Sequence, residues 1–266
     1  MQKSKILILA MLCLVMPTSC SKYSKLLKST DNEAKYAEAL RYYENKNYDR
    51  TLQLFDVLQS AYRGKSEGEN IAYLTAECYY HKADYEIASQ YYKRYAANYP
   101  FAQRTEDALY KSAMCYYKLS PSLSLDQTDT DNAIKEFQNF INMYPESENV
   151  ESANGKIDTL RRKLEEKDYE KCLLYFKTEE YQAATVSFET FMKDYPGTVH
   201  REEILAYMVV NYNRYAEKSV VGKQRERYEL AIEKFNTLSY IFPDSKYIKE
   251  LEPVVVKIRE KLSKYK

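Results

Sequence analysis

A spacing pattern built from a small residue, an aromatic residue and an aromatic–proline pair recurs four times along the chain. The aromatic residue lies four positions after the small one, and the proline lies eight positions after that aromatic residue. The copies are Ala88/Tyr92/Tyr99-Pro100, Ala133/Phe137/Tyr144-Pro145, Ala184/Phe188/Tyr195-Pro196 and Ala231/Phe235/Phe242-Pro243. Proline lacks an amide donor and clashes with a continuing helix, so each pair is expected to end a helix. The pattern therefore predicts a repeated helical unit.

A second pattern lies in the first helix of three hairpins. Its four members recur at a spacing of 37 residues, twice. They are Tyr36/Ala39/Tyr42/Tyr43, Tyr73/Ala76/Tyr79/Tyr80 and Tyr110/Ala113/Tyr116/Tyr117. Small and aromatic residues at fixed places, with proline closing the second helix, are typical of tetratricopeptide (TPR) repeats of about 34 residues. The sequence predicts an all-α TPR solenoid of about five helical hairpins with a C-terminal capping helix.

The hairpins divide into two arrays. We expect residues 32–145 to form an N-terminal array of three repeats, and residues 146–266 to form a C-terminal array. The latter begins with an unbroken helical pattern from Val150 to Lys177, the long first helix of the fourth repeat, whose second helix is 181–195. It continues through the fifth repeat (202–242) and ends in a capping helix, 245–264, with Pro253 inside it. Two departures from the repeat, 120–131 and 217–227, predict longer loops, which serve either as partner contacts or as tolerated surface insertions.

The N-terminus has the features of an export signal. Lys3 and Lys5 precede an apolar stretch too short to span a bilayer comfortably, and small residues lead to Cys20. Residues 1–19 are thus predicted to be a lipoprotein signal peptide, with Cys20 lipidated and residues 20–31 acting as a lipid tether. The alternative is an ordinary signal peptide in which Cys20 occurs by chance.

The remaining composition argues against catalysis and against nucleic acid. No GxSxG, P-loop or HExxH motif occurs, so we expect no enzymatic activity and no cofactor. No cysteine pair has zinc-ligand spacing, so no metal site is expected, and Cys78, Cys115 and Cys172 are predicted to be core residues. The formal net charge is +1, which does not favour a nucleic-acid partner.

The candidate binding residues are tyrosines on the first helices. Within each of three helices two tyrosines lie seven residues apart, which places them on one helix face. They are Tyr36 and Tyr43, Tyr73 and Tyr80, and Tyr110 and Tyr117. One interpretation is a groove for an extended or hairpin peptide with aromatic residues. The other is that one ring of each pair packs between helices.

The chain resembles the BamD family, the TPR lipoproteins of the outer-membrane β-barrel assembly machinery. The resemblance rests on Cys20-Ser-Lys-Tyr-Ser-Lys-Leu-Leu-Lys-Ser29, five repeats, Asp126-Gln127, Tyr144-Pro-Glu-Ser-Glu148 and Ile157-Asp-Thr-Leu-Arg-Arg-Lys-Leu164. It implies a non-enzymatic scaffold, lipid-anchored at the periplasmic face of the outer membrane. The front repeats, Tyr36 to Tyr117, would face unfolded barrel substrates. Residues 165–264 would dock on periplasmic domains of the central barrel subunit.

Two other classes of protein fit parts of the pattern. A periplasmic TPR adaptor for cell-wall or division machinery would share the repeats without needing a lipid anchor. An envelope enzyme with a helical accessory domain would need a catalytic cluster, which the sequence does not contain.

Overall fold

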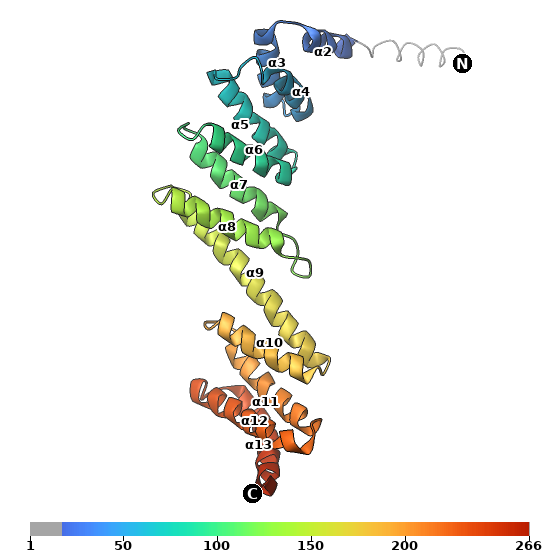
Figure 1. Cartoon of the computed structure of the whole chain (residues 1–266), viewed down its shortest axis with the longest axis vertical. Coiled ribbons are helices and arrows are strands. Elements are labelled where there is room, and N and C mark those ends of the chain that lie inside the picture. Colours follow the sequence, from blue (N-terminus) through green and yellow to red (C-terminus); the bar gives the residue numbers. More distant parts are fainter. Residues whose placement is uncertain (1–17, 266) are drawn as a thin grey trace, which may run out of the picture. The chain divides into compact units, whose positions relative to one another are not determined.

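The computed structural model of the protein describes residues 18–265, with side chains from Lys22 onward. Almost all of the predicted signal peptide, and the side chain of Cys20, lie outside the described residues. Every regular element within the described range is helical (Figure 1). The helices are α2 (Thr18–Lys28), α3 (Asn32–Glu44), α4 (Tyr48–Leu58), α5 (Ser66–His81), α6 (Tyr85–Asn98), α7 (Thr105–Leu119), α8 (Thr128–Met143), α9 (Val150–Lys177), α10 (Tyr181–Asp194), α11 (Arg201–Glu217), α12 (Val221–Ile241) and α13 (Lys246–Leu262), followed by the 3-10 turn η2 (Ser263–Tyr265).

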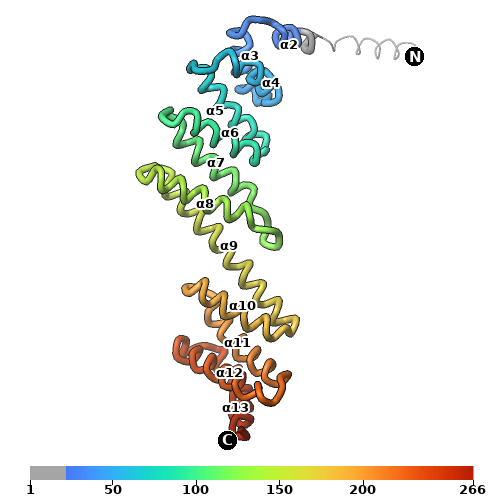
Figure 2. The backbone as a smooth tube through the Cα atoms, viewed as in Figure 1, coloured from blue at the N-terminus to red at the C-terminus, as the bar shows by residue number. Residues whose placement is uncertain are grey.

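The described chain forms two compact units. The first extends to Ser122 and includes Asp126–Asp158, whereas the second comprises Leu123–Leu125 and the chain from Thr159 onward. In the first unit, α3/α4, α5/α6 and α7/α8 are consecutive helical hairpins; in the second, α10 to α13 follow one another along the tube in Figure 2. Residues of the long helix α9 belong to both units. The predicted all-α class of TPR hairpins is confirmed.

Three of the hairpins turn in the same way although none has a glycine there. Lys46, Ala83 and Glu179 each lie two residues before the second helix, with φ angles of 58°, 61° and 59°. Their amides donate to carbonyls three residues back, and the next amide reaches five back, as from Asp84 to Tyr79. This double closure is the Schellman arrangement, which satisfies carbonyls at the helix end. This arrangement reverses the direction of the chain, so that the second helix runs antiparallel to the first.

The second helices end where the aromatic–proline pairs predict. Helices α6, α8, α10 and α12 each stop one residue before the aromatic member of a pair. The aromatic residue still donates its amide to a carbonyl four residues back, as from Tyr99 to Tyr95. Proline has no amide to continue the ladder, so the helix ends there. The four prolines thus fix the C-terminal ends of four second helices.

The repeated small and aromatic residues lie in the hairpin cores. Ala88, Ala133, Ala184 and Ala231 are fully buried, as are Tyr92, Phe137 and Phe188. Cys78, Cys115 and Cys172 are also buried and free, which confirms their prediction as core residues. Burial raises the pKa of the Cys78 and Cys115 thiols to about 12. These thiols therefore stay protonated at neutral pH and are poor nucleophiles.

The predicted loop at 217–227 is wrong. Helix α12 begins at Val221, so only three residues separate it from α11, and the additional residues lengthen the helix instead of the turn. The ion pairs Lys223–Glu226 and Arg225–Glu229, at 3.1 and 2.9 Å, lie at helical spacings that favour this extension. The expected loop at 120–131 is shorter than predicted, because α8 already begins at Thr128.

The segment expected to be a tether is largely helical. Helix α2 places Tyr23, Leu26 and Leu27 against the core of the first hairpin. The Tyr23 hydroxyl donates to Gln53 Oε1 at 2.8 Å, and its ring meets Tyr42 with centroids 5.7 Å apart. At the other end, α13 runs from Lys246 to Leu262 through Pro253 without a break.

Candidate binding site

The six candidate tyrosines fall into two rows with different surroundings. We call Tyr36, Tyr73 and Tyr110 the tied row, because each hydroxyl hydrogen-bonds to the following first helix. Asn70 Nδ2 donates to the Tyr36 hydroxyl at 2.8 Å, the Tyr73 hydroxyl donates to Asp107, and the Tyr110 and Ser152 hydroxyls are 2.9 Å apart. These tyrosines connect each hairpin to the next within the first unit.

The open row consists of Tyr43, Tyr80 and Tyr117. Their rings are half-buried against the second helix or turn of the same hairpin, with centroids 5.9 Å from Tyr48, 5.4 Å from Tyr85 and 6.4 Å from Phe137. None of the three hydroxyls hydrogen-bonds to a residue that the structure describes. Burial, the largest cause, raises the pKa of Tyr43 to about 12, so its hydroxyl is a neutral donor at physiological pH. A half-buried ring with an available hydroxyl suits contact with a peptide.

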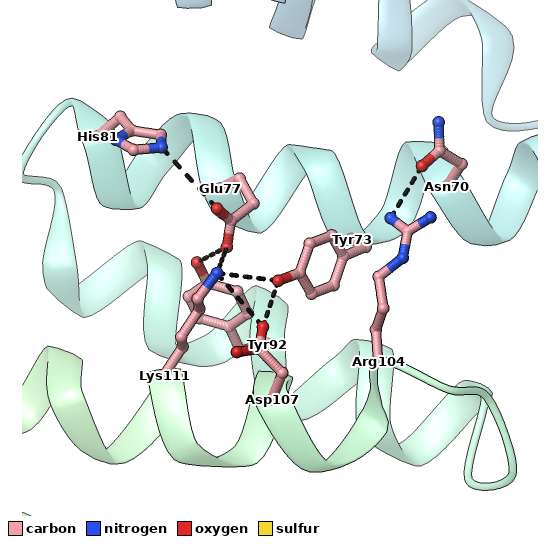
Figure 3. A network of polar contacts seen from close by, with 8 residues as sticks. All are labelled: Asn70, Tyr73, Glu77, His81, Tyr92, Arg104, Asp107 and Lys111. Atoms are coloured by element: carbon pink, nitrogen blue, oxygen red, sulfur yellow. Dashed lines mark hydrogen bonds and ion pairs between the residues drawn. The ribbon is translucent and has the colours of Figure 1, made fainter. Parts of the chain in front are cut away.

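A polar network surrounds the middle member of the tied row (Figure 3). Lys111 Nζ donates to Glu77 Oε1 at 2.8 Å and to the Tyr73 hydroxyl at 2.9 Å, and lies 3.2 Å from Asp107 Oδ2. The Tyr92 hydroxyl donates to Glu77. These contacts join α5, α6 and α7 through five side chains, which we call the polar network: Tyr73, Glu77, Tyr92, Asp107 and Lys111.

The charges of the polar network stabilise each other. Burial alone would lower the pKa of Lys111, but the hydrogen bond and charge of Glu77, with Asp107, outweigh it and raise this pKa. Burial and then the neighbouring carboxylates raise the pKa of Tyr73, and burial with the charge of Glu77 raises that of Tyr92. At neutral pH the lysine is therefore charged and both tyrosines are protonated donors. The network has no activated nucleophile, so its geometry supports a packing role.

Arg104 and Asn70 extend this arrangement at the N-terminal end of the two first helices. The Arg104 guanidinium carbon lies 4.8 Å from the centre of the Tyr73 ring, and Nη1 donates to Asn70 Oδ1 at 2.9 Å. A cation thus lies over the Tyr73 ring, a contact favoured by the electron-rich face of the ring. Tyr73 is 8% exposed, so of the six tyrosines it is the least available to a ligand.

The second unit has the same constellation, which sequence reasoning missed. His200 stacks on Tyr169 with ring centroids 3.8 Å apart, and its Nε2 lies 3.1 Å from Glu166 Oε2. The Tyr169 hydroxyl donates to Glu203 Oε2 at 2.6 Å. The two polar contacts, Glu166–His200 and Tyr169–Glu203, each join residues 34 apart, like Asn70–Arg104 and Tyr73–Asp107. A search for tyrosine–acid pairs at this spacing would have found Tyr169 as the counterpart of Tyr73 in the second unit.

A sequence profile of the YfiO family, described as outer membrane lipoprotein, matches residues 28–230. The chain belongs to this family. Among solved structures, this YfiO-family protein is similar to the TPR domain of P58(IPK), at 15% identity and a TM-score of 0.41, covering 90% of this chain and 68% of that one. It is also similar to a TPR repeats protein from Bacteroides fragilis NCTC 9343, at 12% identity and a TM-score of 0.38, covering 86% and 100%. No curated protein sequence matches it.

Two further properties of this YfiO-family protein concern membranes and metals. Among the helices of residues 18–265, none combines the length and apolar character that a membrane crossing requires. Over the same residues, His, Cys, Asp and Glu side chains form no group of three or more suited to a metal ion.

Proposed function

We propose that this protein is a non-enzymatic, lipid-anchored scaffold of the outer-membrane β-barrel assembly machinery, as in the BamD family. The observation that carries the proposal is the family match across residues 28–230. It agrees with the cysteine at position 20 behind an export signal, and with an array of helical hairpins whose first helices carry aromatic rings. The protein would be anchored at the periplasmic face of the outer membrane through Cys20.

The first unit is proposed to bind unfolded barrel proteins through the open row. Barrel strands alternate apolar and polar residues and carry aromatic girdles, so an extended segment offers rings on one side. Tyr43, Tyr80 and Tyr117 recur at the 37-residue repeat and keep hydroxyls available for the hydrogen bonds of such a segment. The tied row contributes by holding the hairpins in register. The residues from about 165 to 264 would bind the periplasmic domains of the central barrel subunit.

Purification from membranes tests the proposal against its alternative. The wild-type protein, isolated from solubilised membranes, is expected to recover a large outer-membrane barrel protein. The Cys20→Ala variant should instead appear in the soluble periplasmic fraction, because one cysteine carries all the acyl chains, and each buried methylene contributes about 0.8 kcal/mol. Mass spectrometry of both fractions provides the measurement.

The alternative, a periplasmic adaptor for cell-wall or division machinery, predicts another result. Recovery of cell-wall enzymes without a barrel subunit would reject the proposed function. A Cys20→Ala variant that remains with membranes after a high-salt wash would reject the lipid anchor separately. As a control for the substitution itself, Cys172→Ala should leave the fractionation unchanged, because that thiol is buried in the second unit.

Peptide binding distinguishes the two rows of tyrosines. The double variant Tyr80→Ala/Tyr117→Ala is expected to bind a peptide from the C-terminal strand of an outer-membrane barrel protein about thirtyfold more weakly, because each of the two lost aromatic contacts costs roughly 1 kcal/mol. Fluorescence anisotropy with the labelled peptide provides the affinity. Circular dichroism checks that the helices remain.

The matched control removes hydroxyls from the tied row and keeps the rings. Tyr36→Phe/Tyr110→Phe should alter the peptide affinity by less than about twofold, while lowering stability by roughly 1 kcal/mol per lost hydrogen bond. Equal loss of affinity in both double variants would contradict the assignment of binding to the open row. Unchanged affinity in the alanine variant would contradict peptide binding by the open row.

A further inference from the structure

The first unit also has a groove, and its lining residues are different from the six candidate tyrosines. Two adjoining cavities of about 210 and 250 Å³ share Gln59, Thr75 and Tyr91. The first is lined by the segment that follows α4 and the second by α4 itself. Both are also lined by the hairpin α5/α6, and neither includes a member of the tied or open row. Together they form a channel along the second helices of the first two hairpins, which we call the α4–α6 groove.

The floor of the α4–α6 groove is aromatic. Tyr79 and Tyr91 stack with ring centroids 5.1 Å apart and an interplanar angle of 19°. Tyr95 lies beneath the first cavity, where its hydroxyl donates to Glu69 Oε1 at 2.8 Å. Near the N-terminal end of α5, a β-carbon on Gly68 would lie 2.1 Å from the Tyr62 carbonyl oxygen, so no larger residue fits there. The shape of this wall is therefore fixed by close backbone packing.

The charge of the first cavity is uniformly positive. Arg63 and Arg94 line it, whereas no carboxylate does. The Arg94 guanidinium carbon lies 5.0 Å from the centre of the Tyr91 ring, and neither arginine pairs with a carboxylate in the described part of the chain. Guanidinium groups bind carboxylates through two parallel hydrogen bonds, so this cavity is complementary to an acidic side chain. The second cavity has one carboxylate, Asp56, and no basic residue.

The dimensions of the two cavities and the side-chain amides in their lining indicate the shape of the ligand. A helix with its side chains is about 10 Å across, which is too wide for cavities of this volume. An extended chain is narrower and directs alternate side chains to the same side. The amides of Gln59 and Asn98 make no side-chain hydrogen bond with described residues and are placed to pair with a peptide backbone.

We propose that the α4–α6 groove binds an extended acidic segment of a protein partner, with a carboxylate between Arg63 and Arg94 and apolar side chains on the tyrosine floor. The occupant is distinct from the aromatic barrel segments assigned to the open row. The protein would thus bind two kinds of peptide on separate surfaces of one unit.

A peptide of simple composition tests this proposal on the full mature protein. The probe is a labelled decapeptide that alternates glutamate with valine, which favours an extended chain. It is expected to bind at least tenfold more tightly than the same peptide with glutamine in place of glutamate. Arg63→Gln/Arg94→Gln should weaken its binding between tenfold and a hundredfold, as expected for hydrogen bonds between charged groups.

Two further variants distinguish peptide binding in the groove from non-specific attraction between the acidic peptide and positive charges on the protein. Arg161→Gln/Arg162→Gln removes the same charge from exposed positions of α9 and should leave the affinity unchanged. Gln59→Trp keeps the charge but fills the position shared by both cavities, and should reduce binding at least tenfold. Equal losses in the two double-arginine variants, or unchanged binding in Gln59→Trp, would overturn the proposal.

Two other results would also decide against it. Equal affinity for the glutamate and glutamine peptides would exclude recognition of a carboxylate. Binding of phosphatidylglycerol vesicles that Arg63→Gln/Arg94→Gln abolishes, without binding of the glutamate peptide, would assign the groove to a membrane surface. The open-row variant Tyr80→Ala/Tyr117→Ala should retain glutamate-peptide binding, so failure of the open row as a binding site and failure of the groove are distinguishable.

Discussion

Replacing Lys111 by methionine is expected to lower the free energy of unfolding by about 2–4 kcal/mol, because it leaves a carboxylate without its cation in the interior. The side chain of Glu77 is 9% exposed, and its Oε1 accepts from Lys111 Nζ at 2.8 Å. Methionine preserves most of the aliphatic stem, so the loss reflects the charge. The expected loss in free energy of unfolding is smaller than for a fully buried pair because the Lys111 side chain is 28% exposed. Urea denaturation followed by circular dichroism measures it.

Two variants serve as controls for this prediction. In Glu77→Gln/Lys111→Met the anion is also removed, and the glutamine oxygen can still accept from Tyr92, so much of the lost stability should return. Lys223→Met breaks an ion pair in which both side chains are more than half exposed, and should cost less than about 1 kcal/mol. If Lys111→Met costs no more than Lys223→Met, the polar network does not stabilise the first unit.

The pH dependence of the wild-type protein follows from the same lysine. Because the pKa of Lys111 is raised in the folded state, the folded protein holds this proton more tightly than the unfolded chain. The stabilisation is therefore fully present at neutral pH and below. It is lost only as the pH rises from the ordinary lysine value through the raised one.

The repeat pattern predicts the fold because its residues act locally. A proline ends a helix whatever surrounds it, and an alanine permits close helix contact wherever it recurs. For this reason the ends of α6, α8, α10 and α12 agree with the aromatic–proline pairs. The prediction of a loop at 217–227 failed because a departure from the repeat was equated with a loop. An added segment that favours the helix lengthens it instead, and α12 begins at Val221.

The candidate site was predictable only in part. Seven-residue spacing places two tyrosines on one face of a helix, but it gives no information on what lies opposite each ring. Opposite Tyr73 lie Asp107 and Lys111, on the next first helix, which makes this tyrosine a core residue. The burial of Glu77 was equally unpredictable from the sequence, because an acidic residue on a helix is usually solvated. Its burial depends on Lys111 and Tyr92, which are distant in sequence.

The four-copy pattern does not imply four equal contributions to stability. Phe188 and Phe235 hold the same place in successive copies, yet Phe188 is fully buried whereas Phe235 is half-buried. The difference follows from what covers them. Phe188 packs in a core with Tyr212 and other residues of the next hairpin, but Phe235 is the last copy and packs with Leu251 and Val255 of the single helix α13.

Phe188→Ala is therefore expected to cost about 3–5 kcal/mol, and Phe235→Ala about 1–3 kcal/mol, because the cavity left by a fully buried ring cannot refill with solvent. Urea unfolding gives the two values. Amide hydrogen exchange should show lost protection in α10 and α11 for the first variant, and in α12 and α13 for the second, since each repeat contacts chiefly its neighbours. Equal destabilisation by both substitutions would mean that α13 covers the last hairpin as completely as another hairpin would.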